Sequence, residues 1–134
     1  MTGLPSPLVR SLIVCEDIIV DPGNNKRVSL VNVLNSIRSI DEPPYPLRYR
    51  ELCVFVQFTA CRGRGEVRLE IRRADTEEVL FATQTRSVSF PNDPVTVHGL
   101  RFRIRNCTFP APGLYWIQFW YDNGLLTQQP IVLC

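Results

Sequence analysis

The chain has 134 residues, of which 45% are apolar and 21% are charged, and its net charge is +2. This length fits one domain, and the composition is that of a globular protein rather than a disordered one. No segment approaches the roughly 18–20 apolar residues of a membrane-spanning helix. The small net charge is unlike the strong basic excess of most nucleic-acid-binding proteins.

The five cysteines indicate a reducing environment. They lie far apart in the sequence, their number is odd, and none forms a C-x-x-C pair. A secreted domain held by disulfides normally has an even number at close spacings. We therefore predict a cytoplasmic protein.

Apolar and polar residues alternate with a period of two in short segments separated by Pro, Gly and Asn clusters, which is typical of a β-sandwich or barrel. We expect strands over residues 11–20, 27–39, 52–60, 66–72, 78–88, 97–107, 114–121 and 125–133. The proline-rich segment 42–46 cannot pair inside a sheet, so we expect a loop or an edge there that crosses between two sheets. Asn123-Gly124 predicts a type I′ hairpin turn.

Seven or eight antiparallel strands of this length pack as two layers rather than one flat sheet. The predicted fold is therefore all-β, a two-sheet antiparallel sandwich of immunoglobulin-like or related Greek-key topology. We expect residues 1–10 to form an N-terminal arm and residues 11–134 to form the single sandwich domain.

Catalytic or metal chemistry has little support in the sequence. His98 is the only histidine, whereas hydrolytic triads and most zinc sites depend on histidine. The nucleophile motif G-x-S-x-G and the calcium-loop spacing are both missing from the sequence. We predict a chain that is not an enzyme, with no catalytic residues, no metal and no cofactor.

Strand 114–121 is the most informative segment for function. One face carries Tyr115, Ile117, Phe119 and Tyr121, which we expect in the core, and the opposite face carries Trp116, Gln118 and Trp120. Two tryptophans on the outer face of a strand require a cover, because large exposed apolar patches mark interaction sites. If strand 52–60 lies beside this strand, Phe55 extends the same surface.

Three kinds of cover are open at this point. The first is a protein interface, either with a second copy or with another protein, because tryptophan dominates interface energetics and two-fold pairing is common. The second is the same chain, for example the segment 41–50. The third is a small ligand such as a glycan. We predict a non-catalytic protein-interaction or assembly module, with carbohydrate or small-ligand binding as the alternative.

A basic stripe gives a further, less favoured alternative. Arg101, Arg103 and Arg105 lie on one face of strand 97–107 and span about 14 Å, a spacing that could follow phosphates. Glu66 and Glu70 lie on a similar outer face, and cross-strand charge pairing is common. We therefore consider nucleic acid a less favoured partner than a protein. We also expect the chain not to bind a membrane.

Several motifs in the chain resemble one family. They are the strand ELCVFVQFT, the corner R-x-A-D-T, the loop F-P-N-D-P and the run C-T-F-P-A-P-G-L-Y-W-I-Q-F-W-Y, and the N-terminal SLIVCEDIIVD also fits. The stretch from about residue 51 to 133 resembles a family of small uncharacterised bacterial proteins, a domain of unknown function. The resemblance implies a stand-alone β-sandwich in a bacterial cytoplasm, and it implies no activity.

Overall fold

The structure, a computed structural model, describes residues 7–59, 63–90 and 97–134. These residues form strands and no helix. The described part of the chain therefore contains no helix that could cross a membrane. The strands are β1 (Leu8–Asp21), β2 (Asn24–Val33), β3 (Ser36–Ile37), β4 (Leu47–Thr59), β5 (Gly63–Arg73), β6 (Val79–Ala82), β7 (Arg86–Phe90), β8 (His98–Phe109), β9 (Gly113–Tyr121) and β10 (Gly124–Leu133).

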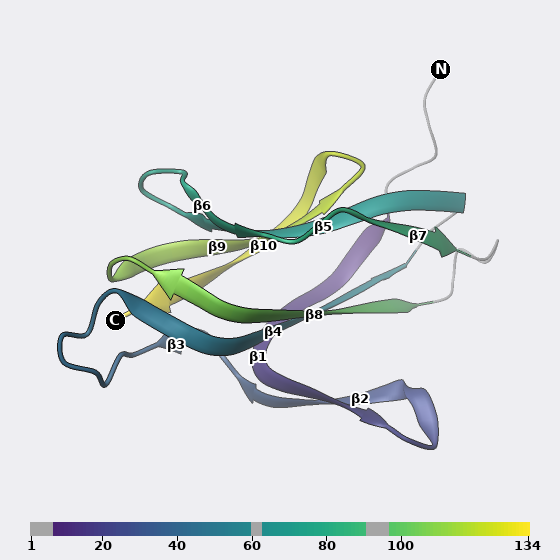
Figure 1. Ribbon diagram of the computed structural model, residues 1–134. Coiled ribbons are helices and arrows are strands. Elements are labelled where there is room, and N and C mark those ends of the chain that lie inside the picture. The colour runs from purple at the N-terminus through teal and green to yellow at the C-terminus, as the bar shows by residue number, and fades with distance from the viewer. Residues whose placement is uncertain (1–6, 60–62, 91–96) are drawn as a thin grey trace.

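The strands form two sheets that pack as two layers (Figure 1). The first sheet has the order β2-β1-β4-β8, and the second has the order β3-β10-β9-β5-β6, with β7 also paired to β5. Every pairing is antiparallel except that of β3 with β10. The predicted two-sheet sandwich is confirmed. The chain crosses between the layers after β2, β3, β4, β7 and β8.

The described residues contain ten strands because two expected strands are each divided. The segment 27–39 forms β2 and β3, and the segment 78–88 contributes to β6 and β7. After β6, the Thr83 hydroxyl accepts the Leu69 N–H at 2.9 Å, which takes this donor from the backbone ladder. β1 begins at Leu8, so the last three residues of the expected arm belong to the sandwich.

The core lies between the layers and is built from alternate residues of each strand, as the period of two requires. On β9 the inward side chains are the four that the sequence predicts, Tyr115, Ile117, Phe119 and Tyr121. They meet an inward row of β4, namely Leu52, Val54, Val56 and Phe58. The outer faces of both sheets are therefore left to the opposite rows.

Two predicted connections are also present. The proline-rich segment joins β3 in the second sheet to β4 in the first, and its Tyr45 packs on the core and donates a hydrogen bond to the Cys134 carbonyl at 2.7 Å. The turn between β9 and β10 has Asp122 and Asn123 at its centre, with φ of 47° and 64°. Two positive φ values define the type I′ turn, which lies one residue earlier than expected.

The β1–β2 hairpin leaves the plane of the first sheet. β1 pairs with β4 from Leu8 to Cys15 and then continues with β2 alone. Side chains from the hairpin pack on the outer face of β4: a second apolar cluster contains Cys15, Ile18, Cys53 and Phe55, with Val28 and Leu30 against it. In Figure 1 the hairpin lies beneath the first sheet, on the side away from the core.

The inward position of Gly65 on β5 gives a test of the packing. The hydroxyl end of Tyr121 occupies the place where a β-carbon of residue 65 would stand. Gly65→Ala should therefore lower the free energy of unfolding by about 1–3 kcal/mol, as overpacking of a core does, in urea denaturation. Gly23→Ala is the control, because its β-carbon would meet Asp21 Oδ1 at an ordinary 3.5 Å. Equal stability of the two variants would contradict this packing.

Candidate functional site

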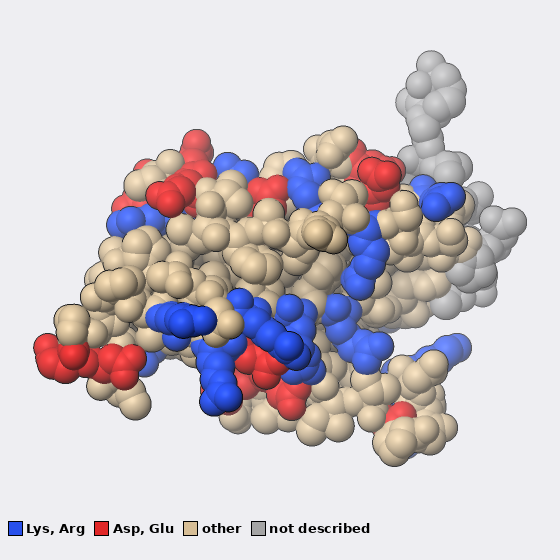
Figure 2. Space-filling model, viewed as in Figure 1, with Lys and Arg blue, Asp and Glu red and all other residues tan. Residues whose placement is uncertain are grey.

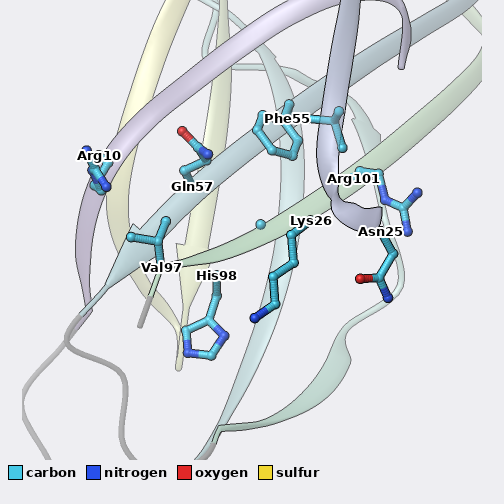
Figure 3. Close-up of a pocket in the computed structure, with 10 residues that line it drawn as sticks. Arg10, Asn25, Lys26, Phe55, Gln57, Val97, His98 and Arg101 are labelled. Carbon is cyan, nitrogen blue, oxygen red and sulfur yellow. The ribbon is translucent and has the colours of Figure 1, made fainter. Parts of the chain in front are cut away.

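A groove lies between the tip of the β1–β2 hairpin and the outer face of the first sheet (Figure 3). Its volume is about 710 Å³, within the usual range of ligand pockets. We call it the hairpin groove and define it by its lining residues, Arg10, Asn25, Lys26, Val28, Phe55, Gln57, Val97, His98, Gly99 and Arg101. It is formed by strands β1, β2, β4 and β8, together with Val97, which precedes β8.

The charged residues among the described lining of the hairpin groove are all basic. Arg10 comes from β1, Lys26 from β2 and Arg101 from β8, and none of the described lining residues is acidic. All three side chains are exposed, and none of them forms an ion pair with a described carboxylate. Figure 2 shows Lys and Arg side chains beside the hollow at the hairpin. The groove is therefore suited to an anion.

The floor of the hairpin groove combines apolar and amide groups. Phe55 and Val28 supply apolar surface, and the β-carbon missing from Gly99 would lie 3.1 Å from two carbons of the Phe55 ring. The Gln57 Oε1 accepts a hydrogen bond from Ser11 Oγ at 3.2 Å. Its amide nitrogen has no partner among the described residues, which leaves a neutral donor beside the three cations.

The described contacts of His98 are packing contacts with aromatic rings. Its ring lies 5.0 Å from the Phe90 ring and 6.0 Å from the Phe58 ring, measured between centroids. Its Nε2 is buried and has no hydrogen-bond partner within the described part of the chain. No three His, Cys, Asp or Glu side chains of the described residues gather as metal ligands would.

The buried cysteines are poor nucleophiles. Burial, reinforced by the neighbouring Cys53 thiol, raises the pKa of Cys15 to about 11, and burial also raises the pKa of Cys107 to about 11. Both thiols are therefore protonated at neutral pH, and the thiolate is the reactive form. The described cysteines, Cys15, Cys53, Cys107 and Cys134, are free, and Cys61 lies outside the described residues.

The basic stripe of β8 is divided by ion pairs. Arg103 bonds Asp17 at 3.0 Å and Glu51 at 3.1 Å, and Arg105 lies 3.5 Å from Glu51. Arg101 is the stripe member that lines the hairpin groove. The carboxylates that neutralise the stripe thus come from β1 and β4 of the same sheet. The expected partners Glu66 and Glu70 lie on β5 in the other sheet.

The expected aromatic surface is split between opposite sides of the sandwich. Trp116, Gln118 and Trp120 lie on the outer face of the second sheet, whereas Phe55 lies on the outer face of the first. The two sets cannot combine, because β4 and β9 belong to different layers. Phe55 is only 7% exposed, because the hairpin covers it.

The second-sheet residues form a hydrogen-bonded network with their neighbours. Trp120 Nε1 donates to Gln118 Oε1 at 3.3 Å, and Gln118 Nε2 donates to Gln128 Oε1 at 3.0 Å. The Arg68 guanidinium lies 4.6 Å from the centroid of the Trp120 ring, a cation–π contact. The observed cover of Trp120 is thus an arginine from the adjacent strand, and Trp116 and Trp120 remain half-buried.

Glu70 holds this network in place between two arginines. Arg68 Nε and Arg72 Nη2 donate to its two carboxylate oxygens at 2.8 Å and 2.9 Å. Burial opposes ionisation of Glu70, but the hydrogen bonds from Arg68 and Arg72 outweigh it and hold the pKa of Glu70 below its ordinary value. Its ionised form therefore helps to fix Arg68 over Trp120.

Sequence reasoning missed Arg10, Lys26 and Gly99 as members of one site. They come from three segments that only the bend of β1 brings together. The available signal was the row of apolar side chains at positions 18, 28 and 30 of the hairpin. Such a row indicates that the hairpin covers another surface, although it does not say which one.

The pKa of Glu70 leads to a pH-dependent test. The lowered folded-state pKa means that ionised Glu70 stabilises the fold above its unfolded pKa, about 4.3, and that this contribution is lost as pH falls through the folded pKa. The stability difference between the wild type and Glu70→Gln should therefore shrink when the pH is lowered from about 6 to about 3 in urea denaturation. Glu66→Gln, on an exposed residue of the same strand, should show no such convergence.

Comparisons with known proteins identify the family and the fold. No curated protein matches the chain. Among matching solved structures is the Pseudomonas fluorescens alkylpurine DNA glycosylase AlkC bound to DNA containing an abasic site analog, with a TM-score of 0.54 and 9% identity. The match covers 96% of this chain but only 30% of that one, so the likeness shows the fold alone. A family model matches residues 10–133, and the chain therefore belongs to a family of unknown function, DUF6941.

Proposed function

We propose that the chain is a non-catalytic binding module that takes an anionic ligand in the hairpin groove. The observation that carries this proposal is the placement of Arg10, Lys26 and Arg101 around one groove that no described carboxylate lines. Elsewhere on the same face, Arg103 and Arg105 are already paired with Asp17 and Glu51. Within the groove, by contrast, no described carboxylate forms an ion pair with Arg10, Lys26 or Arg101.

The chemistry of the groove supports an anion in two ways. Hydrogen bonds to charged groups contribute about 1.5–3 kcal/mol each, more than neutral ones. Each of the two arginines offers several donors in a planar fork that matches carboxylate or phosphate oxygens. The Gln57 amide adds a donor that carries no charge. Together these groups provide attraction at a distance and directional bonds at contact.

Binding of inorganic pyrophosphate tests this proposal. Isothermal titration at about 20 mM ionic strength, where screening is weak, should show binding to the wild type. Lys26→Ala and Arg101→Ala should each weaken it about tenfold, which corresponds to the loss of one charge-assisted hydrogen bond. Arg38→Ala, on an exposed arginine outside the groove, should bind like the wild type. A wild type that does not bind, or equal losses in all three variants, would contradict the proposal.

Association through the outer face of the second sheet is a second candidate function. Leu114, Leu125 and Val132 are 39%, 42% and 43% exposed, and they lie beside Trp116 and Trp120 on this face. Tryptophan and arginine, both present here, are enriched at the energetic centres of protein interfaces. We propose a second copy of the chain as the partner, because two-fold pairing of one face with itself is the commonest form of assembly.

Light scattering after size-exclusion chromatography tests the second candidate. The wild-type mass should rise towards that of a dimer with increasing concentration. Leu114→Glu combined with Val132→Glu should give a monomer at every concentration, because the repulsion and desolvation of the four carboxylates in a symmetric dimer oppose pairing. Ile40→Glu is the control, since Ile40 is 95% exposed in the connector before β4. A monomeric wild type at all concentrations would remove this candidate.

A further inference from the structure

We propose that the ligand of the hairpin groove is a compact organic phosphate with a flat apolar body. This inference rests on the proposed function and adds the chemical class of the ligand. It joins three features of the groove: its volume, its apolar floor and the spread of its cations. Each feature excludes a different group of anions.

The volume excludes a small inorganic anion as the full occupant. The groove is open to solvent and has a volume of about 710 Å³, whereas one water molecule in the liquid takes about 30 Å³. A phosphate ion, only a few times larger than water, would leave most of this space filled with solvent. A ligand with an organic body would fill more of the groove than inorganic phosphate does.

The floor favours a body that is flat and apolar. Gly99 lies within β8 with no positive φ, so its backbone conformation does not require glycine. A glycine inside a strand often marks a place where another group approaches the backbone closely. Here the Phe55 ring lies over one side of Gly99, and Val28 and Val97 continue the apolar surface. The Phe55 ring thus takes the place of a side chain at position 99, and a flat ring can lie against Val28, Val97 and the exposed edge of Phe55.

The cations favour a ligand with about two negative charges. Figure 3 shows Arg10 and Arg101 on opposite sides of the groove, with Lys26 between them. A phosphate monoester carries about 1.5–2 negative charges at neutral pH and three acceptor oxygens, whereas a carboxylate carries one charge. Of these two groups, the phosphate monoester has the larger charge and the more acceptor oxygens for the three cations.

The ion pairs beyond Arg101 favour a compact ligand over a long polyanion. A chain of phosphates that continued along β8 would next meet Arg103, which Asp17 and Glu51 already bond. These carboxylates would repel the phosphates and would have to release Arg103 and Arg105 first. The favourable region therefore ends near Arg101, and the ligand that fits it is confined to the hairpin groove.

A series of four small probes tests the inference with the whole chain. Phenyl phosphate should bind at least about tenfold more tightly than inorganic phosphate, because its ring removes apolar surface from water on binding. It should also bind at least about tenfold more tightly than benzoate, and phenol should show no saturable binding. Dissociation constants come from NMR chemical-shift titration at low ionic strength.

Two variants separate the apolar floor from the charges. Gly99→Val should remove the preference for phenyl phosphate over inorganic phosphate while inorganic phosphate still binds. Val97→Ser should reduce the same preference, and it changes a residue that is 40% exposed and outside any strand, so it keeps the test valid if Gly99→Val does not fold. If folded Gly99→Val and Val97→Ser both still prefer phenyl phosphate over inorganic phosphate, the apolar floor is not the cause of this preference.

The outcomes distinguish this inference from the proposed function. Inorganic phosphate that binds as tightly as phenyl phosphate would overturn the organic ligand but leave an anion site. Benzoate that binds as tightly as phenyl phosphate would overturn the requirement for a dianion. Failure of every probe, pyrophosphate included, would overturn the proposed function itself.

Discussion

The contact between the β1–β2 hairpin and the outer face of β4 is the interaction on which the candidate site depends. Cys53 and Phe55 are apolar residues on the side of the first sheet that faces away from the core. Without the hairpin, these two side chains would be exposed to water. Ile18 from the hairpin packs against them, and burial of a side chain of this size contributes about 1.5–3 kcal/mol. The hairpin stays over the sheet for this reason, and the groove is the space that remains beside the contact near its tip.

The two outer faces of the sandwich shield their outward apolar side chains from water in different ways. The first sheet buries its outer apolar residues under a separate element, which creates a hollow. The second sheet covers Trp120 with the side chain of its own neighbouring strand, where Arg68 lies on the ring and Glu70 fixes that arginine. Side-chain cover from within the sheet leaves a flat surface. Only the cover by the β1–β2 hairpin produces a concave site, which is why the two faces suggest different ligands.

The period of two in the sequence predicted which side chains point inward, and this part of the structure follows from local rules. Tyr115 and Phe119 are buried as expected, and the I′ turn after them is shifted by one residue because Asp122 adopts a positive φ before Asn123. Assignment of strands to sheets was not predictable in the same way. Alternation says that Phe55 and Trp116 point outward, but it does not say whether they share a face, because that depends on which layer each strand joins. The hairpin groove depends on the same information and on a bend within β1.

The division of the β8 stripe shows how charge pairing can define a site. Three arginines with equal spacing would attract anions equally along the strand if they stood alone. Asp17 reaches Arg103 because it lies on the hairpin segment just after β1 separates from β4, and Glu51 reaches the same arginine from β4. The bend that forms the groove therefore also supplies one of the carboxylates that neutralise the charge outside it. Geometry and electrostatics mark the same boundary, next to Arg101, and this agreement is the physical basis for placing the ligand on the hairpin side of it.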